Sequence, residues 1–438
     1  MSLGFTRAGF RAVGSVERDQ RAAETYARNF HDNRRTVGCE IQDLEPARYL
    51  AGLGIAGGVD VLVGGPPCQA YARVGRAKLR AVRNHPLAFR LDPRGALFQY
   101  FLDWVSELRP LAVVIENVPD MLNYGGTNLA HTVCSELAAR GYTSRYGLLN
   151  SVHYGVPQSR ERLFIVAVSR FTGMVPVLPE PTHAFALPSG YQIVRRAAEK
   201  HAVDDPYRLP PSHGGGHLPA VTAWEALADL PATMGPHSRR EQKEMAAWTG
   251  PYREDMPPSA YAMAMRNWVG YASEGRVRDH VTRVLLRDYE TFARMPLGAE
   301  YPAAVQVAEE IFEEHVRTGR AGPGDRNRYV PPYDPRKFPN KWWKLDPGRP
   351  SRTLTAHMGK DTYSHIHYDA AQARTITVRE AARLQSFPDG FRFSGAMNDA
   401  FRQIGNAVPP LLAYAVARQL LRQLQGEDVA ALAEGLAR

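Results

Sequence analysis

Cysteine and long apolar runs are both scarce in this chain of 438 residues. The three cysteines, Cys39, Cys68 and Cys134, are too few and too scattered for a disulfide framework or a four-ligand zinc site. No apolar run approaches the ~20 residues that cross a bilayer, and the N-terminus has no signal-peptide pattern. We therefore expect a cytoplasmic protein with free thiols and no metal site.

Lysine is also rare, because only 7 of the 54 basic residues are lysines. The others are arginines, which are better suited to bidentate contacts with phosphate and guanine. Together with a formal net charge of +9, this composition favours a polyanionic partner. A genome whose base composition enriches arginine everywhere would produce the same bias, so both interpretations stay open at this point.

The first ~170 residues alternate between strand and helix patterns, which predicts an α/β fold with a mostly parallel sheet. Expected strands include residues 59–63, 111–115 and 162–168, and expected helices are 18–29, 95–108 and 128–140. In such sheets, ligands bind beyond the carboxyl ends of the strands. Because Cys68 and Glu116 both follow strand ends, we expect a thiol and a carboxyl group in one crevice.

The turn that carries Cys68 has an unusual composition. Gly64 and Gly65 permit a tight turn and a close approach to a ligand, and Pro66 and Pro67 stiffen the exit toward the thiol. An isolated cysteine is usually inert packing. Packing a small side chain does not require two glycines and two prolines beside it, so this turn predicts a reactive cysteine.

Residues 171–350 are rich in Pro, Gly, His and aromatic residues and show little sustained periodicity. A segment this long is better interpreted as a second, irregular domain than as a loop. Regular patterns return afterwards, with expected helices at 378–385 and 411–424. We therefore expect a regular α/β domain at 1–170, an irregular domain at 171–350, and a regular return segment at 351–438.

Five blocks follow one another along the chain: Gly65-Pro-Pro-Cys68-Gln69, Glu116-Asn117-Val118, Gln158-Ser-Arg160-Glu-Arg162, Thr375 to Pro388, and Gln403 to Pro410. In composition and order they resemble the motifs of the DNA (cytosine-5) methyltransferase family. A single tripeptide would be a weak signal, but five blocks in the family's order cover nearly the whole chain. The resemblance implies a Rossmann-like methyltransferase domain for catalysis and cofactor binding at 1–170 and a smaller target-recognition domain at 171–350. The return segment 351–438 would complete both. It also implies S-adenosylmethionine as cofactor, duplex DNA as partner, and a place in the interior of a bacterial or phage-infected cell.

The resemblance assigns four catalytic residues. Cys68 would add to carbon 6 of cytosine, Glu116 would contact ring nitrogen 3, and Arg162, with Arg160 beside it, would stabilise charge near the 2-oxygen. Each has a simpler alternative. Glu116 could cap the turn that follows its strand, and Arg160 could be solvated or bind phosphate.

The family pattern also implies cofactor and DNA contacts. Glu17 would hold ribose hydroxyls, unless it is an ordinary first-turn carboxylate, and Leu97 would pack on the cofactor, unless it is a helix-core leucine. The full cofactor set is Glu17, Glu40, Ile41, Gly65, Pro67, Leu97, Asn406 and Ala407. The predicted DNA contacts are Gln69, Lys341 and Lys344. Lys341 and Lys344 flank the tryptophans Trp342 and Trp343, and such interleaving of bases and aromatics suits nucleic acid, although a tryptophan pair more often belongs to a hydrophobic core. We expect a monomer, with a cognate restriction endonuclease as a further partner.

Two departures from the family pattern bear on activity. The chain begins at Met1 inside the glycine-loop motif, so the first strand would be missing, and either the start is misassigned or the chain is a truncated, impaired form. Ala72 stands where relatives commonly carry Ser, which would tune the catalytic loop. The alternatives are a DNA-binding remnant and, disfavoured by the large insert, a tRNA cytosine methyltransferase.

Overall fold

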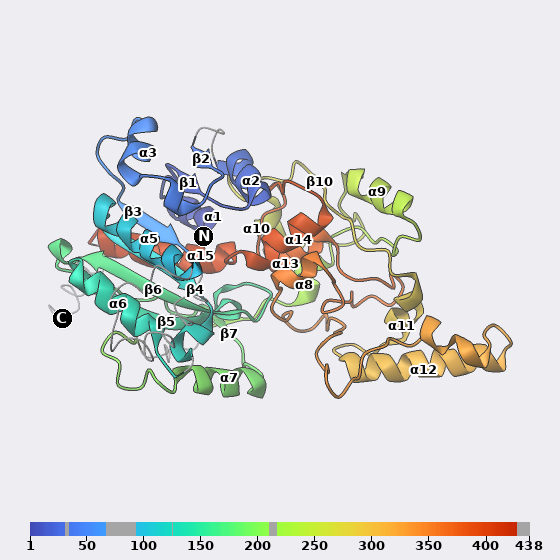
Figure 1. Cartoon of the computed structure of the whole chain (residues 1–438). Coiled ribbons are helices and arrows are strands. Elements are labelled where there is room, and N and C mark those ends of the chain that lie inside the picture. Colours follow the sequence, from blue (N-terminus) through green and yellow to red (C-terminus); the bar gives the residue numbers. More distant parts are fainter. Residues whose placement is uncertain (31–34, 67–92, 125, 210–216, 427–438) are drawn as a thin grey trace. The chain divides into compact units, whose positions relative to one another are not determined.

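The computed structural model describes residues 1–30, 35–66, 93–124, 126–209 and 217–426. The chain forms two compact units (Figure 1). Unit 1 comprises Met1–Gly155, Arg160–Pro219 and the chain from Val408 onward, and unit 2 comprises Val156–Ser159 and Ala220–Ala407. The chain thus leaves unit 1 after residue 219, compared with the boundary near 170 expected from composition, and the return segment 351–438 is divided between the two units at residue 408. Pro67, Cys68, Gln69 and Ala72 lie outside the described residues.

Unit 1 is built on a four-stranded sheet in the order β3-β4-β6-β5. The strands are β3 (Val61–Gly64), β4 (Ala112–Asn117), β5 (Tyr142–Asn150) and β6 (Glu161–Ser169). β3 and β4 are parallel, whereas β6 is antiparallel to both β4 and β5. Two further parallel pairs join β1 (Ser15–Val16) to β2 (Thr36–Val37) and β7 (His183–Ala184) to β8 (Leu218–Pro219). The predicted α/β class is confirmed, and the four-stranded sheet, expected to be mostly parallel, combines one parallel with two antiparallel pairings.

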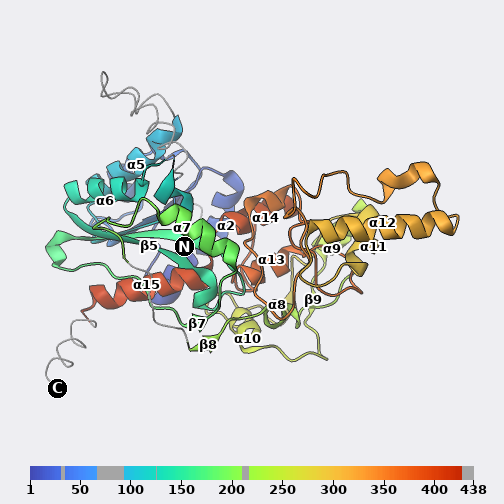
Figure 2. The same cartoon turned by 90° about the horizontal axis from the view of Figure 1, so that it is seen from below.

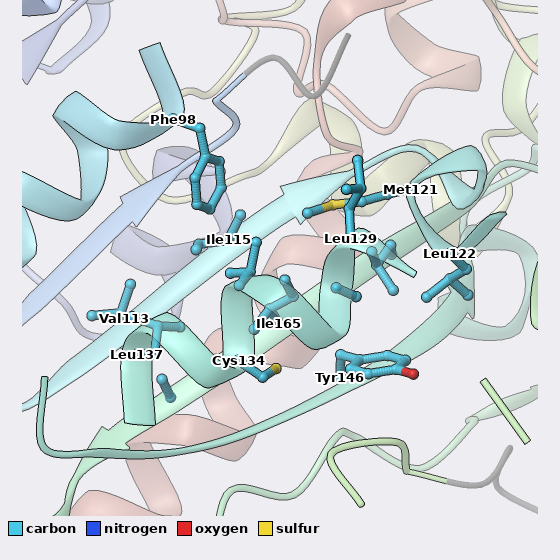
Figure 3. Packing of buried hydrophobic residues seen from close by; sticks show 14 of the residues in the cluster. Phe98, Val113, Ile115, Met121, Leu122, Leu129, Cys134, Leu137, Tyr146 and Ile165 are labelled. Atoms are coloured by element: carbon cyan, nitrogen blue, oxygen red, sulfur yellow. The ribbon is translucent and has the colours of Figure 1, made fainter. Parts of the chain in front are cut away.

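Helices cover both faces of this sheet (Figure 2). Along β4, Val113 and Ile115 pack against α5 (Pro93–Leu108) and α6 (Leu129–Ala139) (Figure 3). The alternate residues Ala112 and Val114 pack against α1 (Ser2–Ala8) and α15 (Pro410–Leu424) on the other face. This alternation explains the continuous apolar run in the sequence, because both faces of the strand are buried. Burying each large aliphatic side chain of the run contributes about 1.5–3 kcal/mol.

Local signals set the limits of α6 as the sequence predicts. Asn128 is the N-cap, and its side-chain oxygen accepts a hydrogen bond from the His131 amide at 3.2 Å. Gly141 follows the helix with a φ of 87°, a conformation that favours glycine. Within α6, Cys134 is fully buried, and burial raises the pKa of its thiol to about 12, so this cysteine is packing. The remaining helices of unit 1 are α2 (Gln20–Phe30), α3 (Pro46–Gly52) and α7 (Ser189–Glu199).

Unit 2 is mainly short helices and loops. Its helices are α8 (Ala223–Leu227), α9 (Arg239–Ala247), α10 (Ala260–Arg266), α11 (Tyr289–Arg294), α12 (Tyr301–Arg317), α13 (Val378–Leu384) and α14 (Met397–Asn406), with β9 (Gly250–Pro251) antiparallel to β10 (Arg276–Val277). The 17-residue α12 departs from the expected irregularity; it buries only a narrow stripe of Tyr301, Ala304, Ala308 and Ile311. Throughout the described ranges, no helix combines the length and apolar character needed to cross a membrane.

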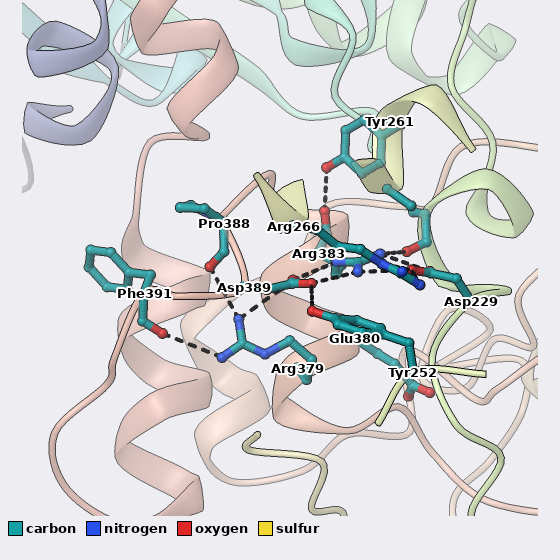
Figure 4. A network of polar contacts seen from close by, with 12 residues as sticks. Asp229, Tyr252, Tyr261, Arg266, Arg379, Glu380, Arg383, Pro388, Asp389 and Phe391 are labelled. Atoms are coloured by element: carbon teal, nitrogen blue, oxygen red, sulfur yellow. Dashed lines mark hydrogen bonds and ion pairs between the residues drawn. The ribbon is translucent and has the colours of Figure 1, made fainter. Parts of the chain in front are cut away.

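A buried polar network stabilises unit 2 around α13 (Figure 4). The Arg383 guanidinium is fully buried and donates hydrogen bonds to the carboxylates of Asp229 and Asp389. Arg374 pairs in the same way with the buried Glu380. These charges are compensated inside the protein, as buried charges must be. The block from Thr375 to Pro388 therefore serves to hold unit 2 together.

Candidate active site

The exits of β3 and β4 lie side by side, because the two strands are parallel neighbours. The Nδ2 amide of Asn117 donates a hydrogen bond to the carbonyl oxygen of Pro66 at 2.9 Å. A Cβ atom placed on Gly65 would lie 3.3 Å from Oε2 of Glu116, which is tighter than an ordinary contact. The loop that leads toward Cys68 is thus fixed to the strand end that carries Glu116, and glycine permits the close approach.

Glu116 forms an ion pair with Arg162 at the edge of the sheet where β4 ends. Nε of Arg162 lies 2.9 Å from Oε1 of Glu116, and each side chain is 14% exposed. The antiparallel pairing of β4 and β6 produces this contact, since the end of β4 lies beside the start of β6. Nη1 of Arg162 also donates to the carbonyl oxygen of Glu161 at 2.7 Å, which fixes the guanidinium further. The structure thus brings together two of the predicted catalytic residues.

Burial controls the protonation of this pair. Burial raises the pKa of the Glu116 carboxyl, although Arg162, Arg160 and the Met1 amino group act in the opposite direction. The ion pair favours the carboxylate and burial favours the neutral acid, and burial has the larger effect. Burial likewise lowers the pKa of Arg162. Glu116 therefore keeps a proton to higher pH than an exposed glutamate does, and in that form it can donate a hydrogen bond.

Arg160 lies on the same approach to β6 but is buried, with 1% exposure. Burial, and next the charge of Arg162, lower its pKa to about 9. Its backbone amide donates to Oδ1 of Asn150 at 3.2 Å and to Oγ of Ser151 at 3.1 Å. A solvated role for Arg160 does not fit this burial.

The predicted cofactor residues of unit 1 lie at strand ends. Glu17 follows β1 and Glu40 follows β2, two strands that pair in parallel. Helix α2 begins at Gln20, and Oδ1 of Asp19 accepts from the Ala22 amide at 3.0 Å, so Glu17 precedes the helix and is not a carboxylate of its first turn. Oε1 of Glu17 accepts from the Asp19 amide at 2.9 Å, and burial raises the pKa of this carboxyl. Ile41, on the segment after β2, and Leu97, on α5, are both half-buried apolar residues.

Asn406 and Ala407 belong to unit 2, at the end of α14. The carbonyl oxygen of Ala407 accepts from Nε2 of Gln385 at 2.6 Å, while the Asn406 side chain is exposed. A Cβ on Gly405 would lie 2.2 Å from the backbone of Thr355, so only glycine fits there. The backbone at this position is thus held rigidly and presents Asn406 at the surface.

One of the two predicted lysine contacts acquires another role. Lys344 is buried, and its Nζ donates to the carbonyl oxygens of Phe292, Ala293 and Met295, which uses all three N–H groups. We therefore propose no DNA contact for Lys344. Lys341 keeps a half-buried side chain, with Nζ 4.0 Å from the ring centroid of Tyr333 and 3.8 Å from Asp361.

Sequence reasoning assigned no role to Asn117 and Gln158, although both stand in recognised blocks. Asn117 fixes the loop after β3, as described above. Gln158 is fully buried in unit 2, where it contacts Gln385 and its Oε1 accepts from the Leu354 amide at 2.9 Å. Their positions in the blocks were visible, but their partners are remote in sequence, so no local signal could reveal these bonds.

The comparisons with known proteins agree on one family. The sequence profile of C-5 cytosine-specific DNA methylases matches residues 1–422. An Oceanobacillus iheyensis protein named as a candidate type II methyltransferase is 35% identical over 441 residues, or 97% of this chain and 94% of that protein. The type II methyltransferase M.AgeI of Thalassovita gelatinovora is 30% identical over 443 residues, or 95% of each chain.

A solved structure supports the fold independently. It is a candidate DNA modification methyltransferase encoded within an E. coli prophage, and it aligns with a TM-score of 0.64 at 22% identity over 97% of this chain and 96% of that one. At that identity the likeness concerns the fold alone. The sequence matches decide the family: this chain belongs to the C-5 cytosine-specific DNA methylases, enzymes that use S-adenosylmethionine to methylate cytosine in DNA.

Proposed function

We propose that this enzyme methylates cytosine in duplex DNA through a transient covalent bond between Cys68 and carbon 6 of the base. The observation that carries the proposal is the buried Glu116 carboxyl, held by Arg162 beside the exit of β3. Cys68 follows Pro66 by two residues, and Pro66 is hydrogen-bonded to the residue after Glu116. The chain connectivity therefore favours a nucleophile and an acid that act on one base.

The chemistry explains why these residue types are required. Carbon 5 of cytosine is a poor nucleophile in an aromatic ring, so the Cys68 thiolate first forms a bond to carbon 6. Electron density moves toward ring nitrogen 3, where protonated Glu116 donates its hydrogen bond or proton. Arg162 stabilises the charge near the 2-oxygen while it keeps Glu116 in place. After carbon 5 is methylated, its proton leaves to a base and the Cys68 thiolate is expelled, which restores the ring.

The residues of unit 1 fit the methyl donor. Glu17 and Glu40 place carboxylates after two paired parallel strands, where ribose hydroxyls and an amino group find acceptors, and Ile41 and Leu97 offer apolar surface for an adenine ring. When bound, S-adenosylmethionine supplies an electrophilic methyl group. We propose that Gly65, Pro67, Asn406 and Ala407 complete this set, with the exposed Asn406 side chain available to hydrogen-bond the methionine end.

Carbon 6 of a stacked cytosine is inaccessible, so the base must leave the helix at a cost of roughly a few kcal/mol. We propose that Gln69 and Lys341 contribute to the DNA contacts that compensate for this cost. Because both relatives described above are named as type II methyltransferases, we further propose that this monomeric enzyme protects DNA in a restriction–modification system beside a cognate endonuclease.

Nucleoside analysis tests the proposal. The full chain is incubated with S-adenosylmethionine that carries a tritiated methyl group and, in separate reactions, with duplex DNA from a strain without cytosine methylation and with tRNA. We expect labelled 5-methyldeoxycytidine in the digested DNA and none in the tRNA.

The Cys68→Ala variant should lose this product, and Cys39→Ala, which changes a cysteine that has no proposed role, should retain it. Label confined to tRNA, or an equal yield from Cys68→Ala, would contradict the proposal. A DNA complex that forms without any transfer of label would also contradict it.

A further inference from the structure

The turn formed by residues 333–341 in unit 2 presents two aromatic rings to solvent. Phe338 is 53% exposed and Tyr333 is 46% exposed. Their ring centroids lie 6.2 Å apart at 78°, an edge-to-face pair. Large apolar side chains that gather on a surface mark an interaction site more often than isolated ones do.

The backbone of this turn is held rigidly at both ends. The hydroxyl of the buried Tyr301, the first residue of α12, donates to the Tyr333 carbonyl oxygen at 3.1 Å and accepts from the Tyr333 amide at 3.2 Å. The Tyr301 amide donates to the Pro339 carbonyl oxygen at 3.2 Å. Within the turn, the amides of Lys337 and Phe338 both donate to the Asp334 carbonyl oxygen at 3.1 Å. A fixed backbone of this kind presents the rings at little further cost in conformational entropy.

Positive charge is concentrated around these rings. Residues 317–352 contain ten arginines and lysines and three acidic residues. Four of these cations are already engaged: Arg326, Lys341 and Arg352 pair with acidic residues outside the segment, and Lys344 is buried. The Arg336 side chain is 90% exposed, and its pair with Asp334 at 3.3 Å is a surface contact that a phosphate can replace. Lys337 is exposed as well, and Lys341 lies over the face of Tyr333.

The neighbouring Trp342 is not part of this surface. Trp342 is 1% exposed and stacks on Tyr363, with centroids 4.6 Å apart at 7°. It also packs against Phe292 and Tyr301 in the core of this part of unit 2. Within residues 333–344, the Trp342 ring is therefore buried in the core, and the Tyr333 and Phe338 rings are exposed.

We infer that Phe338 stacks against the bases of duplex DNA, while Arg336 and Lys337 contact the flanking phosphates and Lys341 supports the Tyr333 ring. In a duplex, a ring reaches a base face by inserting between two base pairs, which costs roughly a few kcal/mol of unstacking. The phosphate contacts of the neighbouring cations offset this cost, and the insertion tolerates any sequence because every base has a π face. An acidic protein partner would suit both the cations and the rings, since aromatic residues and arginine are enriched in protein interfaces as well, so DNA is preferred here because it is the substrate of this family. The inference rests on DNA as the substrate of this family and names the surface that holds it.

Binding measurements test this contact separately from catalysis. The probe is a fluorescein-labelled pool of 30-base-pair duplexes of randomised sequence, and Kd is measured by anisotropy over a range of salt concentrations. Phe338→Ala should weaken binding by between about 5-fold and about 150-fold with an unchanged salt slope. Lys337→Gln should reduce the slope of log K against log salt by about 0.9, as expected for one lost phosphate contact.

Two variants serve as controls. Phe171→Ala removes a ring that is 96% exposed in unit 1, and it should bind like the wild type. Phe338→Trp keeps a stacking ring and should bind within the wild-type range, which separates stacking from a structural effect of the substitution. Wild-type affinity of Phe338→Ala would overturn the inference, and so would weak binding by Phe338→Trp. Because no methyl transfer is measured, loss of the stacking contact and failure of the proposed reaction give different results.

Discussion

Substitution of Arg383 by methionine tests how unit 2 is held together. Five hydrogen bonds at 2.6–3.1 Å join the Arg383 guanidinium to Asp229, to Asp389 and to the carbonyl oxygen of Ala226 (Figure 4). Methionine has a similar length and fills most of the space, so the substitution chiefly removes the charge and the donors. Two buried carboxylates then lose their common partner.

The size of the effect follows from the partners that remain. Asp229 keeps Arg266, whose Nε donates at 2.8 Å, and Asp389 keeps the Tyr252 hydroxyl at 2.5 Å. Breaking a buried ion pair on one side costs about 3–5 kcal/mol. Because each carboxylate retains a donor, we expect one such penalty and not two, so the free energy of unfolding should fall by about 3–5 kcal/mol.

Urea unfolding followed by tryptophan fluorescence measures this change. Five of the six tryptophans lie in unit 2, so the signal reports mainly on that unit. Arg240→Met, which changes a side chain that is 89% exposed, is the matched control and should cost less than about 1 kcal/mol. If Arg383→Met were as mild as this control, the network would contribute little and the reasoning would be refuted.

Three further outcomes follow from the structure. Glu116→Gln should slow single-turnover methyl transfer by about 10²- to 10⁴-fold. The wild-type rate should fall as pH rises through the raised pKa of Glu116, and the rate of the variant should lose this pH dependence. A variant with the same pH profile as the wild type would argue against the acid role of Glu116. Gly65→Ala should lower kcat while DNA affinity stays constant, because the new Cβ crowds the Glu116 carboxyl, and a wild-type kcat would contradict this. Burial lowers the pKa of His280 and of His365 from 6.5 to about 4. Between these two pH values the unfolded chain binds more protons than the folded chain, so the free energy of unfolding falls as pH drops. Urea titrations near neutral pH and at about pH 5 should differ by about 2 kcal/mol per histidine, and equal free energies of unfolding would contradict this prediction.

Local signals in the sequence were sufficient for several elements. α6 is predicted by its asparagine cap, its apolar spacing and Gly141, all of which act within the helix. β4 and β6 are predicted because strands covered on both faces need continuous apolar runs. The location of the candidate site, at the strand ends that carry Glu116 and Arg162, was predicted from the family blocks and from the general position of ligands at the ends of strands.

Long-range contacts could not be predicted in this way. Lys344 resembled a surface cation among aromatics, yet its ammonium group is saturated by carbonyl oxygens about 50 residues away in the chain. The bond from Asn117 to Pro66 spans 51 residues and has no local pattern. α12 was hidden because its buried stripe relies on two alanines, which carry little hydrophobic signal. Tertiary partners, and not propensity, determine these features.

The central claim is that Cys68 forms the covalent bond to cytosine, and trapping that bond tests it most directly. In duplex DNA that carries 5-fluorocytosine in place of cytosine, the fluorine at carbon 5 cannot leave as a proton does, so an adduct should persist once S-adenosylmethionine is added. The account predicts a protein–DNA complex that is stable in detergent, with the linkage mapped by mass spectrometry to Cys68 and absent from Cys68→Ala. A linkage at another residue, or no complex from an enzyme that methylates ordinary DNA, would contradict it.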